Sequence, residues 1–307
     1  MSVAFETPSV EVVSAVRSRV GESPLWSVAE RALWWVDIDG RLLHRLDPAT
    51  AETTSWPVAE RIGCIGLHRD GGFVAGLETG IFRLEPQADG RLVAGRLARV
   101  VHPRDDMRFN DGRVDRSGRF WSATMVRDTS LGAAVGALYR FDPRGLSAPL
   151  VPGLATGNGL AFSPDGRILY LSDSHPSVQK IWSFDLAADG ALANRRVFVD
   201  MAEHPGRPDG AAVDADGCYW TCATDAGALL RFTPQGRLDR ALKLPVMKPT
   251  MCAFGGAALD ELYVASLIPA RPGDDGYDPA LAGAVLRLSP GVRGLAERPF
   301  EPALPAP

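Results

Sequence analysis

The sequence predicts an all-β protein with the architecture of a six-bladed β-propeller. Three observations support this fold class. A strand-turn-strand pattern recurs along the 307 residues, each copy is followed by a further strand-and-turn signal, and the copies repeat every 40–50 residues or so, about the length of one blade. The copies begin at Gly21, Ile62, Phe109, Gly157, Pro208 and Thr250.

The first half of each repeat is predicted to be a β-hairpin. The copy FNDGRVDRSGRFWSATM is typical: a short apolar run, a turn, and a second run rich in aromatic and β-branched residues. Four of the turns read RDGG, RSG, PDG and ADG, and the copy from Thr250 has a changed turn. Gly and Asp suit tight hairpin turns because they tolerate a positive φ.

The second half of each repeat supplies further strands. The segments are RLLHRLDP, GIFRLEP, GALYRFDP, KIWSFDL, GALLRFTP and GAVLRLSP. Together with the hairpin, each repeat gives four short strands, which is the content of a propeller blade.

The N-terminal segment 10–20, VEVVSAVRSRV, precedes the first hairpin and belongs to no repeat. We expect it to form the outermost strand of the last blade, so that the ring is closed and two sheet edges are covered. The chain then forms a single propeller domain over 1–307, with a loose tail at 297–307. Two separate β-domains are the alternative, but no Pro- and Gly-rich linker divides the chain near its middle.

Composition and charge exclude several classes of partner. The chain is 46% hydrophobic and 23% charged, with a formal net charge of -4 and no long basic run, so we expect no nucleic-acid partner. No apolar stretch approaches the roughly 18 residues of a membrane span, so no membrane partner is expected either. The first residues lack the pattern of a signal peptide, and we expect a cytoplasmic protein.

The four cysteines fit a reducing location. Cys218 and Cys222 lie four residues apart in a predicted strand, about 13 Å, which is too far for a disulfide. No CxxC pair suggests zinc. We expect all four to be reduced core residues.

One position of the repeat, which we call the ring position, carries an oxygen-bearing side chain in most copies. It lies at the start of the first strand of the hairpin. Its occupants are Glu22, Gly63, Asn110, Asn158 and Asp209, with Thr250 near the matching place in the sixth copy. The innermost strands of a propeller surround its central channel. Side chains at this position should therefore converge at one mouth of the channel, although they are far apart in sequence.

Two carboxylates and two amides around one axis favour a metal site. Unpaired buried charge costs several kcal/mol per ion, and a divalent cation would compensate it. Oxygen ligands suit a hard ion such as calcium, magnesium or manganese. The alternative is that Asn and Asp merely stabilise turns before strands, but their recurrence at one repeat position argues for the ion. Asp111 lies off this position, and we expect it to be structural, hydrogen-bonding the turn.

Four motifs give the chain a resemblance to the gluconolactonase, regucalcin (senescence marker protein) and LRE-like family, which includes sugar lactonases. The motifs are GESPLW at 21–26, RFNDG at 108–112, GNGLAFSPDGRILYLSDS at 157–174 and RPDGAAVDADGCYW at 207–220. The resemblance implies a six-bladed propeller that binds one divalent metal ion and hydrolyses a sugar-acid lactone. It leaves the ion open among calcium, zinc, magnesium, manganese and iron.

The resemblance also implies roles for individual residues. Glu22, Asn158 and Asp209 match the family's metal ligands, and Arg108 and Asn110 match its substrate-contacting pair. For Arg108 the alternative is a surface ion pair with one of the acidic residues at 105–106.

Some relatives have a Glu beyond the next strand that helps to hold the sugar. The corresponding stretch here is ATMVRDTS, in which Asp128 is a shorter acid. We expect Asp128 to bind substrate, and its difference from Glu leaves the identity of the sugar open.

The implied reaction is the opening of a cyclic ester by water. The metal would act as a Lewis acid on the lactone carbonyl. Asp209 is the candidate general base, because one carboxylate oxygen can bind the metal while the other accepts a proton from water. A metal-bound hydroxide is the alternative nucleophile, and the sequence leaves both open.

Three functions compete at this stage. The first is a metal-dependent lactonase with a small-molecule sugar lactone as its partner, acting as a monomer or a small homo-oligomer. The second is a non-catalytic calcium-binding or regulatory propeller. The third is a broader hydrolase acting on aromatic esters or phosphotriesters. A sugar lactonase should have Arg108 and Asn110 beside the metal, whereas an aryl-ester hydrolase should have a wide apolar pocket.

Overall fold

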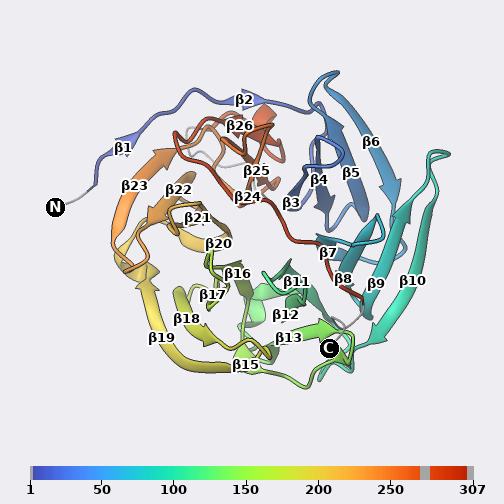
Figure 1. The fold of residues 1–307 in the computed structure, drawn as a ribbon. Coiled ribbons are helices and arrows are strands. Elements are labelled where there is room, and N and C mark those ends of the chain that lie inside the picture. The colour runs from blue at the N-terminus through green and yellow to red at the C-terminus, as the bar shows by residue number, and fades with distance from the viewer. Residues whose placement is uncertain (1–2, 270–276, 303–307) are drawn as a thin grey trace.

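The computed structural model describes residues 3–269 and 277–302, and its strands form six sheets arranged in a ring (Figure 1). The fold is therefore a six-bladed β-propeller, as predicted. The helices of the described residues are short 3-10 turns, η1 (Thr129–Leu131), η2 (Met201–Glu203) and η3 (Pro279–Leu281). None of them is long and apolar enough to cross a membrane.

The blades follow one another along the chain, and within each blade the consecutive strands of the repeat run antiparallel from the channel outwards. Blade one contains β3 (Gly21–Ser27), β4 (Ala32–Asp37), β5 (Leu42–Asp47) and β6 (Glu52–Pro57), and blade two contains β7 (Ile62–Leu67), β8 (Phe73–Leu77), β9 (Gly80–Pro86) and β10 (Leu92–Arg99). Blade three contains β11 (Met107–Val114), β12 (Phe120–Val126), β13 (Gly136–Asp142) and, as a broken outer edge, β14 (Gly145–Leu146) and β15 (Val151–Leu154).

The remaining blades complete the ring. Blade four contains β16 (Gly157–Phe162), β17 (Ile168–Asp173), β18 (Lys180–Leu186) and β19 (Leu192–Asp200). Blade five contains β20 (Arg207–Val213), β21 (Tyr219–Thr224), β22 (Ala228–Phe232) and β23 (Leu238–Lys243), and blade six contains β24 (Pro249–Gly255), β25 (Glu261–Ser266) and β26 (Leu286–Leu288). Each innermost strand begins within two residues of its predicted start.

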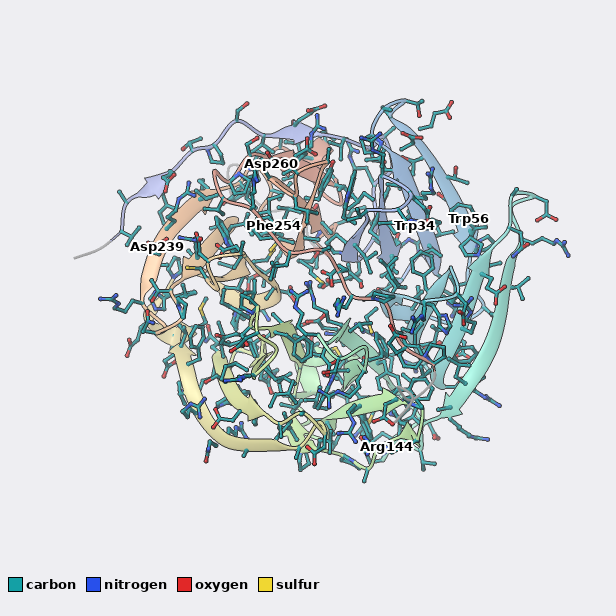
Figure 2. All side chains as sticks on the ribbon, viewed as in Figure 1. Trp34, Trp56, Arg144, Asp239, Phe254 and Asp260 are labelled. Carbon is teal, nitrogen blue, oxygen red and sulfur yellow. The ribbon has the colours of Figure 1, made fainter. Side chains whose placement is uncertain are left out.

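The hydrophobic core lies between neighbouring blades, with one cluster of buried side chains at each of the six junctions. At the junction of blades one and two, the ring of Trp34 stacks on that of Trp56, with the ring centres 5.4 Å apart (both labelled in Figure 2). The Trp34 ring also meets the edge of Phe73 at 4.7 Å. Large aromatic rings suit this place because the blades diverge from the axis and leave wide gaps to fill. The four cysteines are buried and form no disulfide, as predicted.

The N-terminal segment closes the ring as predicted. β2 (Glu11–Val12) pairs antiparallel with β26 and forms the outermost strand of blade six. β1 (Phe5–Glu6) was not predicted, and it adds a parallel fifth strand to blade five by pairing with β23. The N-terminal chain thus covers the edges of two blades (Figure 1).

The described part of the predicted loose tail is packed, which corrects that expectation. We call residues 293–301 the C-terminal arm. It crosses the mouth where the innermost strands end, contacting Asp214 of blade five, Arg113 of blade three and His68 of blade two. Phe300 is 2% exposed and stacks on Phe141 at 5.3 Å. The sequence of the arm lacks strand periodicity, and its single buried aromatic gave no signal; residues 303–307 lie outside the described part.

Candidate metal and substrate site at the channel mouth

The side chains at the ring positions lie at the start of the innermost strands, at the mouth opposite the C-terminal arm. Glu22, Asn110, Asn158 and Asp209 come from four different blades and are only 4–8% exposed. The innermost strands contact one another around the channel, which brings these positions together. The predicted convergence of oxygen-bearing side chains is therefore present.

A shift of register marks the ring position in every innermost strand. The pairing with the second strand of the blade slips by a residue or more at this point in all six sheets. Such a β-bulge bends the strand and re-aims a side chain. At Asn158 the bulge requires a glycine next to it, because Gly159 has φ +63° and a Cβ there would lie 2.4 Å from the Tyr219 hydroxyl. The bulges thus direct the ring side chains to the channel.

A chain of hydrogen bonds joins three blades at the ring. Arg108 Nη1 donates to Asn110 Oδ1 at 2.6 Å, and Asn110 Nδ2 donates to Asn158 Oδ1 at 2.8 Å. Asn158 Nδ2 in turn donates to Ser174 Oγ at 2.7 Å, and Arg207 Nη1 donates to the Ser174 carbonyl at 3.1 Å. This network fixes the Asn158 amide with its oxygen towards Asn110, and that oxygen keeps a second lone pair for a further partner.

Glu22 and Asp209 are both buried carboxylates, and they lie close enough for the charge of Asp209 to act on Glu22. Burial raises the pKa of Glu22 well above its usual range, and the negative charges of Asp209 and Asp111 raise it further. Burial also raises the pKa of Asp209 to about 7. Among the described residues, the Glu22 carboxylate accepts one hydrogen bond, from the backbone N–H of Ser23 at 3.3 Å. The site therefore holds negative charge that the protein compensates incompletely.

This donor set fits a divalent cation. Two buried carboxylates and an amide oxygen are hard oxygen ligands, and three side chains leave positions open on an ion that takes six or more. Glu22, Asn158 and Asp209 would hold it. No group of three His, Cys, Asp or Glu side chains in the described ranges forms a metal-binding cluster, so the amide of Asn158 is needed to complete this set.

Arg108 is a component of the site rather than a surface residue. Its guanidinium bonds to the Phe109 carbonyl and to Asn110, whereas Asp106 pairs with Arg104. The alternative of a surface ion pair with Asp105 or Asp106 is therefore not what the structure has. Its hydrogen-bond acceptors are neutral, and its positive charge lowers the pKa of Glu22, so Arg108 offsets part of the negative charge at the ring.

Asp111 was expected to be structural within its own turn, and the structure gives it a larger place. Its Oδ2 accepts from the Leu160 backbone N–H of the next blade at 2.8 Å, while its buried Oδ1 has no hydrogen-bond partner among the described residues. Its charge raises the pKa of both Glu22 and Asp209. Asp111 therefore links two blades and adds to the negative potential at the ring.

Other predicted residues are less central. Asp128 lies in an exposed loop, where it caps η1 by accepting from the Ser130 backbone N–H at 3.0 Å, and its substrate role stays a prediction. The Thr250 hydroxyl donates to the Gly21 carbonyl and so ties blade six to blade one.

Two residues of the network were missed from the sequence. Ser174 is the last residue of the motif GNGLAFSPDGRILYLSDS, but the motif gave it no role. Arg207 is the first residue of the motif RPDGAAVDADGCYW, and the signal that would have indicated its role is its place two residues before Asp209, on the same face of the strand.

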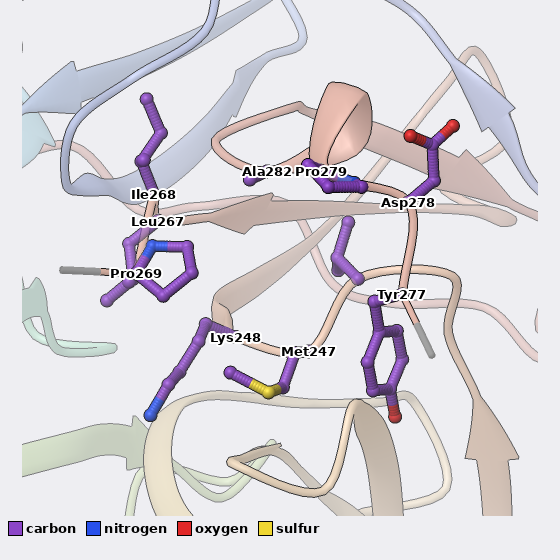
Figure 3. A pocket seen from close by; sticks show the side chains of 10 residues that line it. Met247, Lys248, Leu267, Ile268, Pro269, Tyr277, Asp278, Pro279 and Ala282 are labelled. Atoms are coloured by element: carbon purple, nitrogen blue, oxygen red, sulfur yellow. The ribbon is translucent and has the colours of Figure 1, made fainter. Parts of the chain in front are cut away.

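A hollow beside the ring has a different character (Figure 3). It is bordered by Met247, Lys248 and Tyr277, and the rest of its lining is mainly apolar. Asp278 is the one carboxylate among its described lining residues, so the hollow lacks the set of two carboxylates and two amides found at the ring.

The fold is that of a β-propeller, and oxygen-bearing side chains, two of them carboxylates, lie together at one mouth of its channel. Residues 20–268 of the chain match the protein family described as the SMP-30/Gluconolactonase/LRE-like region. The chain belongs to this family.

Individual relatives cover nearly the whole chain. The 6-deoxy-6-sulfogluconolactonase of Pseudomonas putida is 39% identical and covers 92% of this chain and 95% of its own length. The pentonolactonase XacC of Haloferax volcanii is 33% identical, and the match covers 91% of this chain and 94% of the relative.

Solved structures have the same fold. A luciferin-regenerating enzyme superposes with a TM-score of 0.88 at 28% identity, covering 96% of this chain and 99% of the other. Regucalcin of Agrobacterium tumefaciens, described as a calcium-binding protein, superposes with a TM-score of 0.87 at 25% identity, covering 98% and 100%.

Proposed function

We propose that the protein hydrolyses a sugar lactone to the open hydroxy acid at a divalent cation held by Glu22, Asn158 and Asp209. The observation that carries the proposal is the pair of buried carboxylates, Glu22 and Asp209, set next to the amide chain that orients Asn158. Family membership supports the lactonase activity, because two relatives that cover the chain are named as lactonases. The calcium-binding description of a regucalcin structure supports the cation.

The side chains around the ring would orient the substrate. Arg108 uses Nη1 for Asn110 and the Phe109 carbonyl, and its remaining N–H donors suit ring hydroxyls of a sugar. Asn110 holds both Arg108 and Asn158 in place. The lactone would then lie between Arg108 and the two carboxylates.

The hydrolysis needs a group that moves a proton. A bound divalent cation would polarise the lactone carbonyl as a Lewis acid. Asp209 takes a proton from the attacking water as the water oxygen bonds to the carbonyl carbon. The ring C–O bond then breaks, and Asp209 returns the proton to the departing alkoxide oxygen. Burial of Asp209 excludes bulk water from this exchange.

The test is an assay of aldonolactones with a defined metal. We expect the metal-free protein to be inactive, divalent ions to restore turnover, and Asp209→Asn to lower kcat at least about 100-fold. The control is Asp216→Asn, which changes an exposed acid in the hairpin turn of the same blade. Acid release by a pH indicator is the readout.

Three results would contradict the proposal. Full activity of Asp209→Asn would exclude it as the proton-transfer group. Metal binding without acid release from any aldonolactone would indicate a non-catalytic binding propeller. Faster turnover of aryl esters or phosphotriesters than of lactones would indicate the broader hydrolase.

A further inference from the structure

In blades one and three, the residue that follows the ring position ties its strand to the next blade. Within the described residues, an innermost strand pairs with another strand on one side only, so its remaining N–H groups need other acceptors. Ser23 Oγ of blade one accepts from the Ile65 backbone N–H of blade two at 3.0 Å. Asp111 Oδ2 of blade three accepts from the Leu160 backbone N–H of blade four at 2.8 Å. Both N–H groups lie two residues after the ring position of their own blade, so the two ties are equivalent in the repeat.

Ser23 has a backbone conformation that serine rarely adopts. Its φ is +50°, in the left-handed region, although the residue is only 2% exposed. Two further contacts hold it there: Oγ donates to the Ile65 carbonyl at 3.5 Å, and the backbone N–H donates to Glu22 Oε2 at 3.3 Å. Such strain persists only where the surroundings enforce it, and it is concentrated at functional sites. Ser23 thus connects the Glu22 carboxylate to the next blade.

Blade two transmits the position of blade one to blade three. It carries glycine at the ring position, and a Cβ at Gly63 would lie 2.4 Å from the Phe109 carbonyl oxygen and 2.6 Å from the Asn110 carbonyl oxygen. The backbone of β7 therefore lies directly against that of β11, at the two residues that precede Asp111. A side chain at residue 63 would force these strands apart.

Similar contacts continue to the blades that carry the other two proposed ion ligands. Asn110 Nδ2 donates to the Gly157 carbonyl at 3.0 Å, so blade four is held immediately before Asn158 as well as after it. Tyr219 Oη of blade five donates to the Gly159 carbonyl at 2.8 Å. Buried hydrogen bonds and close packing thus link blades one to five at the level of the ring.

We propose that Ser23 and Asp111 are positioning residues of the cation site, which set the spacing of neighbouring innermost strands so that Glu22 and Asn158 reach the same ion. The inference rests on the proposed function, because it concerns the same cation. Both residues act through the adjacent blade rather than as ligands. An ion requires its ligands within about 0.2 Å of their preferred distances, so a small displacement of one strand weakens binding.

The test is calorimetric titration of calcium, and separately of manganese, into the metal-free protein. Ser23→Ala removes the acceptor of the Ile65 N–H, and Asp111→Ala removes that of the Leu160 N–H. Each should lower ion affinity about 10- to 100-fold, as for other residues that support metal ligands. Asp111→Asn keeps an oxygen that can accept the same N–H, so it should retain more affinity than Asp111→Ala.

A second variant at Ser23 separates ion binding from stability. Ser23→Gly also lacks the hydroxyl, but glycine adopts the left-handed conformation without strain. Ser23→Gly should therefore melt at a higher temperature than Ser23→Ala and still bind the ion about 10- to 100-fold more weakly than the wild type. If Ser23→Ala does not fold, Ser23→Gly provides the same test.

Two controls remove comparable hydrogen bonds in hairpin turns at the other end of the blades. Ser163 Oγ accepts from the Ile168 backbone N–H at 2.9 Å in blade four, and Asp115 Oδ1 accepts from the Ser117 backbone N–H at 2.8 Å in blade three. Ser163→Ala and Asp115→Asn should lower the melting temperature and leave ion affinity unchanged. A loss of affinity in the controls equal to that in the ring variants would show that the effect is only one of general stability.

The outcomes separate this inference from the proposed function. Unchanged ion affinity in the folded Ser23→Gly variant, or equal losses in Asp111→Asn and Asp111→Ala, would overturn the positioning role of that residue while the cation site stands. A wild type that binds neither calcium nor manganese would contradict the cation site and both positioning roles with it. Weakened binding in the variants of a protein that hydrolyses no lactone would support the positioning roles and overturn the proposed activity.

Discussion

At the scale of single residues, the site depends on side chains that orient one another. Asn158 can offer its oxygen to a cation only while its amide nitrogen is held by Ser174 and its oxygen faces Asn110. Ser174→Ala should therefore lower divalent-ion affinity about 10- to 100-fold without removing a ligand, as for other residues that support metal ligands. Isothermal calorimetry with the metal-free protein measures this. Ser183→Ala, at a buried serine of the same blade, is the control, and equal affinities in the two variants would contradict the role of Ser174.

His44 makes a pH-dependent contribution to stability that is remote from the site. It is 1% exposed, its Nδ1 bonds Ser55 Oγ at 2.7 Å, and burial lowers its pKa from 6.5 to about 4. Between these values the unfolded chain binds the proton and the folded one does not, so the free energy of unfolding falls as pH falls from about 6.5 to 4. Above this window the contribution is complete.

The measurement for His44 is denaturant unfolding at several pH values in the wild type and in His44→Gln. The stability difference between them should change by on the order of 3 kcal/mol across the window. Other acidic groups contribute equally to both proteins and cancel. A difference that is constant with pH would show that His44 takes up its proton as easily in the folded state as in the unfolded state.

At the scale of elements, the short N-terminal strands close two blades. β2 pairs with β26, and its Glu11 forms an ion pair with Arg287 at 2.6 Å, while β1 pairs with β23. Deleting residues 1–13 should lower the melting temperature by several degrees and promote aggregation, because two sheet edges become exposed.

The matched control for this deletion is Glu11→Gln, which keeps the backbone pairing and loses only an exposed ion pair worth less than about 1 kcal/mol. A deletion no more harmful than Glu11→Gln would show that backbone pairing at this edge adds nothing. Light scattering and thermal melting distinguish the two outcomes.

Most of the strands and their order in the blades were predictable from the sequence. Hairpins and blade order follow from the repeated turns, and the leftover segment before Gly21 had one free edge to occupy. The parallel pairing of β1 and the broken outer edge of blade three were not predictable, because two-residue strands carry no periodicity. The bulges at the ring positions were also hidden, although a glycine beside Asn158 and beside Asp209 is their trace.

At the scale of the whole molecule, the two ends of the chain stabilise the propeller by different contacts. The N-terminal strands close its outer rim, and the C-terminal arm crosses the mouth opposite the site. Arg113 of blade three connects the arm to blade five, because it pairs with Glu297 of the arm at 2.7 Å and donates to the Ala211 carbonyl of blade five at 2.8 Å. The repeat register predicts which residues occupy the ring positions, whereas the path of the arm depends on contacts between distant blades.

The arm should contribute to global stability. Phe300→Ala leaves a cavity between the arm and Phe141, and we expect it to lower the free energy of unfolding by about 3 kcal/mol. Glu301→Gln, which alters only an ion pair with Arg69 at the surface, should cost less than about 1 kcal/mol. Equal effects of the two substitutions in chemical denaturation would mean that the arm is only loosely attached.

The most direct test of a cation at the ring positions is anomalous diffraction from crystals grown with manganese. A peak is expected at the ring, about 2.0–2.4 Å from oxygens of Glu22, Asn158 and Asp209 together, and it should vanish in Asp209→Asn. A map with no peak at the ring, or with the peak bound by other residues, would contradict the assignment.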